Sequence, residues 1–313
     1  MLEDFLISLR VVVPMALLLG VGVFARRAHM IDQGAARQLD KLNFKIFCPA
    51  TLFNNIYSAD LSSTFNPRVL LFVFCALALV FLLAMTVPRR LVRDRRQCAS
   101  IAQAIVRSNY LIFGVATAEA LYGKGNAGFV ALMGTFVIPA INILAVIALE
   151  LNCSGTTDPL KIIRSVLKNP MIVAAIAAIT VSLLHIRFPE FVYAAVEDLG
   201  GVTTTVSFLS LGVSLDLKAV RANRRPLAVG VLLRMAAVPL LMMPAAVLCG
   251  FRGQELCCLM VLFSAPTGVA TYPLATAMGA DGQLAGQLVY TTTLISVFTM
   301  FCYTFLFRSL GYL

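Results

Sequence analysis

Two short polar clusters lie inside otherwise apolar stretches of this 313-residue chain. The first is RSNY at Arg107–Tyr110, and the second belongs to SAPTGVATYPLATAMG, residues 264–279. A guanidinium such as that of Arg107 binds a carboxylate through two parallel hydrogen bonds. The amide of Asn109 donates and accepts in one place. We therefore expect Arg107, Ser108, Asn109 and Tyr110 to contact a solute, and the arginine suggests an acid.

The second cluster combines residues that interrupt a helix. Pro266 and Pro273 each remove a backbone donor and clash with the preceding turn, and Gly268 permits an unwound backbone. Unsatisfied backbone groups are tolerated at membrane depth only where they face protein or line a cavity. Freed N–H groups at the start of a half-helix attract anions. We expect Pro266, Thr267 and Gly268 to form part of the same site, with an ordinary proline kink as the alternative.

Three of these residues have a second interpretation. Arg107 lies about nine residues, or roughly 13 Å, into its apolar stretch, so its side chain could reach the cytoplasmic surface instead of the solute. Asn109 could satisfy interrupted backbone groups instead of a substrate. The small size of Gly268 could serve close packing between helices.

The composition places the chain in a membrane. Hydrophobic residues make up 60% of the sequence and charged residues 13%, and the mean hydropathy is +0.89; a soluble chain is about 45–50% apolar. The eight cysteines form no CxxC pair, so neither a disulfide framework nor a zinc site is expected. No nucleotide-binding motif is present, and we predict no metal, no cofactor and no enzymatic activity.

The elements that position the clusters are long apolar segments. A membrane span needs roughly 20 mostly apolar residues. We predict an all-α polytopic protein, surrounded by membrane lipid, with ten spans: 6–25, 39–57, 69–87, 98–122, 129–151, 170–184, 191–215, 227–249, 256–278 and 284–307.

The basic residues between these spans alternate by side. Sixteen Lys and Arg residues fall on one side and five on the other. The rule that basic loops face the cytoplasm places both termini outside it, and we expect the bacterial inner membrane. This distribution explains the net charge of +10 without nucleic acid as a partner. The start of the chain, MLEDFLISLR, does not read as a signal peptide.

The two halves of the sequence repeat each other. Pro14 and Pro170 are 156 residues apart, and Pro67 and Pro226 are 159 apart. Five spans per half is an odd number, so the second half must enter the membrane in the opposite orientation, a common plan of transporters. We therefore divide the chain into a first repeat (1–151), a cytoplasmic linker (152–169) and a second repeat (170–313), with chance similarity of apolar helices as the alternative.

Five stretches in this order resemble the auxin efflux carrier family: SNYLIFGVATAEALYG, LKNPMIVAAIAAITVSL, SFLSLGVSLDL, LRMAAVPLL and SAPTGVATYPLA. The family includes plant auxin exporters and bacterial permeases attributed to malonate and malate. The resemblance implies a 5+5 inverted repeat in which helices 4 and 9 are broken and cross. Spans 1, 2, 6 and 7 would form a scaffold, and spans 3–5 and 8–10 a transport domain with an elevator-like motion. It also implies a homodimer.

Site residues carry over by position. Asn109 matches the asparagine of the family's crossover and Pro266 the proline of span 9, while Pro49 and Thr51 match the part of span 2 near the substrate. The sequence departs from the plant pattern at Ser108 and Ala116, which stand where plant members have proline. Span 4 therefore has no proline, and its interruption would depend on other residues.

We conclude that the sequence favours a secondary transporter of small organic anions. The alternative is a cation- or proton-coupled symporter or exchanger of a non-acid solute, which needs an acidic residue at midplane depth. Glu119 and Asp216 lie toward span ends, where structural roles are favoured. Arg234 in span 8 is expected to form an ion pair or to reach the membrane surface. A receptor would carry a signalling domain, and an intramembrane enzyme a nucleophile and base, and neither pattern is seen.

Overall fold

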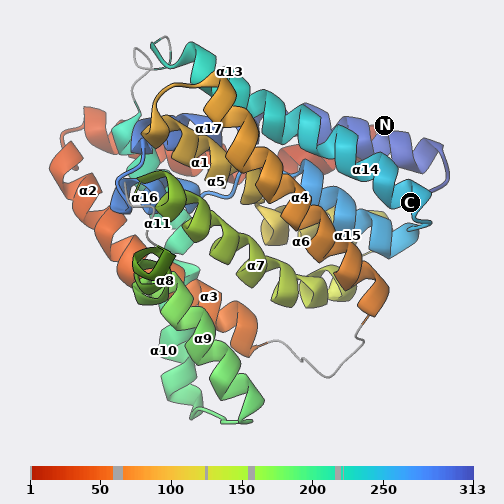
Figure 1. The fold of residues 1–313 in the computed structure, drawn as a ribbon, viewed down its shortest axis with the longest axis horizontal. Coiled ribbons are helices and arrows are strands. Elements are labelled where there is room, and N and C mark those ends of the chain that lie inside the picture. Colours follow the sequence, from red (N-terminus) through yellow and green to blue (C-terminus); the bar gives the residue numbers. More distant parts are fainter. Residues whose placement is uncertain (1, 59–65, 124–125, 154–158, 216–219, 221) are drawn as a thin grey trace.

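The computed structural model describes residues 2–58, 66–123, 126–153, 159–215, 220 and 222–313. The described residues form helices and no strand, apart from a single isolated β-bridge (Figure 1). The helices are α1 (Leu2–Arg27), α2 (Gln33–Leu42), η1 (Asn43–Phe47), α3 (Cys48–Tyr57), α4 (Pro67–Leu91), α5 (Arg95–Val106), α6 (Tyr110–Tyr122), α7 (Gly128–Cys153), α8 (Pro159–Lys168), α9 (Pro170–Leu183), α10 (Glu190–Gly201), α11 (Thr203–Ser214), α13 (Arg224–Leu232), η2 (Leu233–Ala237), α14 (Val238–Leu248), α15 (Gly253–Ser264), α16 (Thr271–Ala277) and α17 (Gly282–Ser309).

Among the described residues, four helices are long and apolar enough to cross a membrane. They are α4, α7, the continuous run Arg224–Leu248 and α17, which contain predicted spans 3, 5, 8 and 10. Three shorter apolar helices are also described: α6 and α9 fall within predicted spans 4 and 6, and α15 overlaps the first part of predicted span 9. The all-helical fold and its several apolar helices agree with the predicted class of membrane protein.

Side-chain caps set where several helices begin. The carboxylate of Asp32 accepts from the amide of Ala35 at the start of α2, and Asp281 accepts from Leu284 at the start of α17. Asn169 caps α9 in the same way, and Pro170 follows it as the first helical residue. These residues satisfy amides that have no partner inside the helix.

Two of the helical runs contain a π-helical turn. The segment η1 joins α2 to α3, and η2 joins α13 to α14. The buried side chains of Asn43 and Arg234 lie in these turns. A π-turn is rare and is often found near a functional site, and both turns adjoin the site described below.

Helix α1 crosses α11 in direct backbone contact. A Cβ added to Gly22 would lie 2.2 Å from the carbonyl oxygen of Leu209, and one added to Gly212 would lie 2.2 Å from that of Leu19. Helix α3 packs against α9 and α10, and these three lie together at the bottom of Figure 1. The backbones of α1 and α11 approach so closely because both contact positions are glycine.

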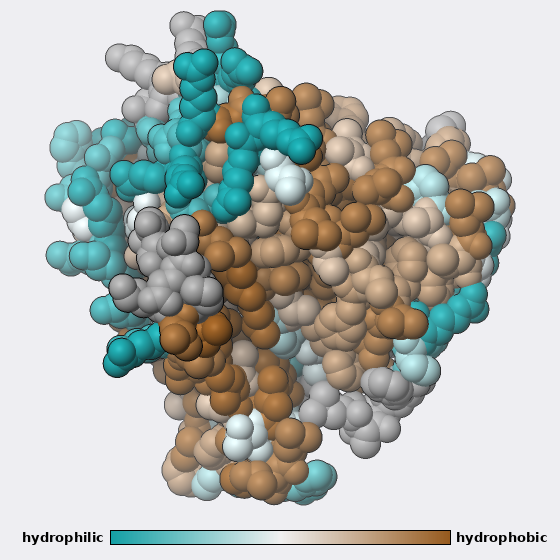
Figure 2. Space-filling model, viewed as in Figure 1, coloured by the Kyte–Doolittle hydropathy of each residue, from teal (hydrophilic) through white to brown (hydrophobic). Residues whose placement is uncertain are grey.

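The surface separates by polarity. Figure 2 shows hydrophilic residues gathered at the upper left of the view, over the ends of α2 and α13, and a broad hydrophobic surface over the middle of the molecule. Both chain termini lie at the right of the same view (Figure 1). The hydrophilic end and the termini are therefore on opposite sides of the hydrophobic surface.

Candidate functional site: the crossing of two extended segments

Two extended segments cross near the middle of the molecule. Helix α5 ends at Val106 and α6 begins at Tyr110, while α15 ends at Ser264 and α16 begins at Thr271. Between these ends, Ser108 and Thr267 form the isolated antiparallel bridge. The amide of Asn109 donates to the carbonyl oxygen of Pro266 at 2.9 Å, and that of Gly268 donates to the carbonyl oxygen of Arg107 at 2.8 Å. Each segment thus satisfies backbone groups of the other away from water.

Arg234 ties the ends of α5 and α15 together. Its side chain is 1% exposed, and its guanidinium donates to the carbonyl oxygens of Ile105 at 2.9 Å, Leu262 at 3.1 Å and Ala265 at 2.6 Å. The last carbonyls of a helix have no partner inside it and carry partial negative charge. Arg234 has the structural role that was expected, although its partners are backbone carbonyls and not an acidic side chain in an ion pair. Because the side chain is buried, the expectation that it reaches the membrane surface is wrong.

A cavity of about 160 Å³ lies beside the crossing. Residues of α3, α9 and α11 line one part of it, including Thr51, Met171 and Thr203, and Ile138 and Asn142 line another from α7. Among the described residues, no Asp or Glu lines the cavity. The wall is mostly apolar with a few polar groups, which is the usual character of a small-molecule site.

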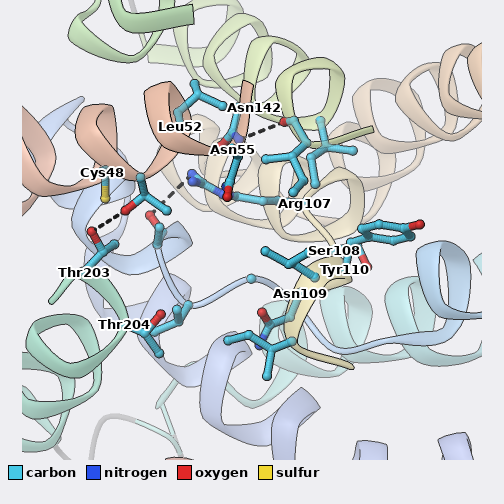
Figure 3. Close-up of a pocket in the computed structure, with 18 of the residues that line it drawn as sticks. Cys48, Leu52, Asn55, Arg107, Ser108, Asn109, Tyr110, Asn142, Thr203 and Thr204 are labelled. Carbon is cyan, nitrogen blue, oxygen red and sulfur yellow. Dashed lines mark hydrogen bonds between the residues drawn. The ribbon is translucent and has the colours of Figure 1, made fainter. Parts of the chain in front are cut away.

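Arg107 is buried at the wall of this cavity, with its side chain 7% exposed. The alternative in which it reaches the cytoplasmic surface is therefore wrong. Its guanidinium has a long contact of 3.4 Å to the carbonyl oxygen of Ala270, and Figure 3 shows the side chain extending toward Asn55 of α3. A buried guanidinium has five donors to satisfy, so Arg107 retains donors for a bound solute.

Two amide groups at the cavity are incompletely paired. The side-chain nitrogen of Asn109 and the side-chain oxygen of Asn142 are buried without a hydrogen-bond partner, although the Asn142 nitrogen donates to Ile138 at 2.8 Å. Figure 3 shows Asn109 well apart from the Arg107 guanidinium, so the two would contact different parts of a solute. A buried polar atom without a partner is unfavourable, and a bound solute would provide one.

Six of the nine residues predicted for the site line the cavity: Thr51, Arg107, Ser108, Asn109, Tyr110 and Gly268. The hydroxyl of Tyr110 points away, donating to the carbonyl oxygen of Val130 at 2.9 Å. A Cβ on Gly268 would lie 3.3 Å from the side chain of Arg107, so glycine there leaves room for the arginine.

The other three predicted residues lie outside the lining. Pro266 and Thr267 are buried within the crossing itself, where the hydroxyl of Thr267 donates to the carbonyl oxygen of Ala104 at 3.0 Å. Pro49 is in the first turn of α3. Asp216, considered above as a proton carrier, lies outside the described residues. Among the residues that the structure describes, no group of three His, Cys, Asp or Glu side chains lies close enough together to hold a metal ion.

Two sequence comparisons relate this chain to known proteins. A sequence profile described as "Membrane transport protein" matches residues 7–304. The chain belongs to this family of membrane transport proteins. A protein of Methanocaldococcus jannaschii described as an uncharacterized transporter is 22% identical over 304 residues, covering 93% of this chain and 96% of the relative. The resemblance to the auxin efflux carrier family is confirmed, and the protein is a multi-pass membrane transporter.

Among the described residues, four polar ones at the cavity of this transporter were not predicted for the site: Asn55, Asn142, Thr203 and Thr204. Asn142 had a signal, because an amide side chain three residues after Pro139 is out of place in the apolar stretch GTFVIPAINILAV. The threonines had a weaker one, since residues 203–205 read TTT. Neither signal says which neighbouring helix the side chain meets.

Proposed function

We propose that this transporter moves small organic anions, and that their carboxylate binds Arg107 in the cavity beside the crossing. The observation that carries the proposal is a buried guanidinium at the wall of a cavity that no acidic side chain of the described residues lines. An uncompensated buried charge is unfavourable. A solute carboxylate would supply the missing partner through a bidentate pair.

We also propose that α5–α6 and α15–α16 are two broken membrane spans in a 5+5 inverted repeat of ten spans. Ser108 and Thr267 are 159 residues apart, the offset already seen between Pro67 and Pro226. The two backbone bonds, from Asn109 to Pro266 and from Gly268 to Arg107, are the exchanged pair that any antiparallel bridge forms. The shared offset of 159 residues is therefore what supports an inverted repeat, as in other transporters of this plan.

The position of the cavity supports an elevator-like motion. One part of its lining belongs to α3, α9 and α11 of the proposed scaffold, and another to the crossing, α6 and α7 of the proposed transport domain. Movement of one domain against the other would carry a bound solute with Arg107. A homodimer remains our prediction for the assembly.

The membrane potential limits the possible cycles. A cytoplasm-negative potential favours anion exit by about 2.3 kcal/mol per charge per 100 mV. Uptake of an anion against this potential needs a coupled cation. The second candidate function is separate from this requirement: a cation- or proton-coupled symporter or exchanger of a non-acid solute on the same architecture.

Thermal unfolding of the purified protein in detergent tests the substrate class. Acetate, malonate, malate and benzoate would be compared at two pH values, with sodium chloride and choline as cation probes. An acid that binds only the folded state stabilises it by about 2.7 kcal/mol at 100 times its dissociation constant. We expect one acid class to raise the melting temperature.

Variants locate the binding. Arg107→Gln and Asn109→Ala should lose the stabilisation by the acid, whereas Arg164→Gln, which changes an exposed arginine of α8, should keep it. Stabilisation by sodium or choline without any effect of the acids would favour the second candidate function instead.

A further inference from the structure

A buried carboxylate lies outside the proposed solute site. Asp40 on α2 is 1% exposed, and neither of its carboxyl oxygens has a hydrogen-bond partner. Burying a charged carboxylate without a partner is strongly unfavourable. Burial of this kind favours the protonated form of the carboxyl group over the charged form.

In the part of the chain that the structure describes, no basic side chain pairs with Asp40. The elements packed against α2 include η1, α11 and α16. The hydroxyl groups of Ser210 on α11 and Tyr272 on α16 face the carboxyl group. The thiol of Cys48 on α3 is also close enough to influence it electrostatically. The basic residues on the same run are exposed, namely Arg37, Lys41 and Lys45.

Hydroxyl groups connect Asp40 to the solute cavity. Thr203, Ser207, Ser210 and Ser214 recur along one face of α11, as the helical period requires. The hydroxyls of Thr51 and Thr203, which both line the solute cavity, are 2.6 Å apart. One turn further along α11, the side-chain amide of Asn43 donates to the hydroxyl of Ser207 at 2.7 Å. Ser210, which lies beside Asp40, is the next hydroxyl residue on the same face of the helix.

The same row of hydroxyls ends at a second cavity. Tyr272 donates to Ser214 at 2.8 Å, and both line a cavity of about 330 Å³. The exposed Arg37 and Arg96 line it too, on the side that carries most basic residues. Gln287, another lining residue, is 3% exposed, and both polar atoms of its side chain lack a partner. Asp40 thus lies along a row of polar groups between two cavities.

We propose that Asp40 binds a proton that crosses the membrane together with the solute. The proton comes from water in the second cavity, bonds to a carboxyl oxygen of Asp40, and is released to water on the other side once α16 has moved. In the proposed scheme α2 belongs to the scaffold and α16 to the transport domain. Movement of the transport domain would therefore take α16 and Tyr272 away from Asp40. The positive charge offsets one solute carboxylate. This inference rests on the proposed transport function.

The proton site can be tested without a solute. Infrared difference spectra of the purified protein between acidic and mildly alkaline pH should contain a protonated-carboxyl band that shifts in heavy water. We expect Asp40→Asn to lose this band. Asp198→Asn, which changes an exposed carboxylate of α10, should keep it. An unchanged band in Asp40→Asn would overturn the proposal.

Coupling is tested in proteoliposomes that enclose a pH-sensitive dye. In the wild-type protein, an inward gradient of acetate, malonate, malate or benzoate should drive proton entry for the acid that moves. Asp40→Asn should lose proton entry, and Asp40→Glu should restore part of it. Melting temperature and gel filtration would verify that both variants fold.

The outcomes separate this proposal from the substrate proposal. Equal proton entry in Asp40→Asn and the wild-type protein would overturn the role of Asp40 while leaving anion transport intact. If none of the acids moves in the wild-type protein, the proposed substrate class fails, and the infrared band still decides whether Asp40 binds a proton.

Discussion

Two buried arginines show that burial alone does not identify a binding residue. Arg234 and Arg107 are 1% and 7% exposed. The guanidinium of Arg234 is occupied by three backbone carbonyls, whereas that of Arg107 has one long contact to Ala270 and faces a cavity. The partners of each side chain therefore assign Arg234 to the architecture and Arg107 to the proposed solute.

Arg107→Lys tests this assignment at the level of one functional group. Lysine keeps the charge but loses the planar pair of donors. We expect the dissociation constant of the stabilising acid to rise by about tenfold, equivalent to ~1.4 kcal/mol, with the melting temperature of the free protein little changed. Isothermal titration calorimetry measures it, and equal affinity in the two proteins would contradict a bidentate contact.

At the scale of elements, two direct backbone contacts, with no side chain between the segments, fix the relative positions of helices. The crossing joins four helix ends through two amide–carbonyl bonds, and α1 meets α11 at Gly22 and Gly212. Both contacts bring together segments from different halves of the chain. The first positions the solute cavity, and the second fixes the helix whose hydroxyl groups lie beside Asp40.

Gly22→Ala should weaken the contact between α1 and α11. The added methyl group would lie 2.2 Å from the carbonyl oxygen of Leu209, and overpacking of this kind costs about 1–3 kcal/mol. Gly20→Ala is a matched control on the same helix, because a Cβ there meets nothing within 4 Å. Thermal unfolding of the two variants compares them, and similar melting temperatures would argue against this helix contact.

At the scale of the whole molecule, charge predicts the orientation in the membrane. The hydrophilic end in Figure 2 and the chain termini in Figure 1 lie on opposite sides of the hydrophobic surface. Basic residues are retained on the cytoplasmic side during insertion. The hydrophilic end, which includes the mouth of the second cavity with Arg37 and Arg96, should therefore face the cytoplasm.

Cysteine labelling in intact cells checks this orientation. In a background with the eight native cysteines replaced, a membrane-impermeant maleimide should label Arg187→Cys from outside. It should label Arg93→Cys only after the cells are permeabilised. Both positions are exposed, so access to the reagent depends on the side of the membrane, and the reverse pattern would overturn the predicted topology.

The sequence alone determined the class of protein, its family and the two polar clusters that meet at the crossing. These features are local: an apolar run of sufficient length reports a membrane helix, and proline, glycine and asparagine mark an interruption wherever they occur. Five of the six predicted residues that line the cavity, Arg107, Ser108, Asn109, Tyr110 and Gly268, were found for this reason, since each lies within or next to an interruption.

Only the tertiary structure decided which side chains from distant segments face one another. Asn43 meets Ser207 across a separation of 164 residues, and Arg234 reaches the ends of α5 and α15. Asp40 falls at the start of predicted span 39–57 and gave no signal of a site, and it is buried because α2 packs against α11 and α16. The rotation and contacts of each helix depend on packing against its neighbours, and a single apolar sequence does not encode them locally.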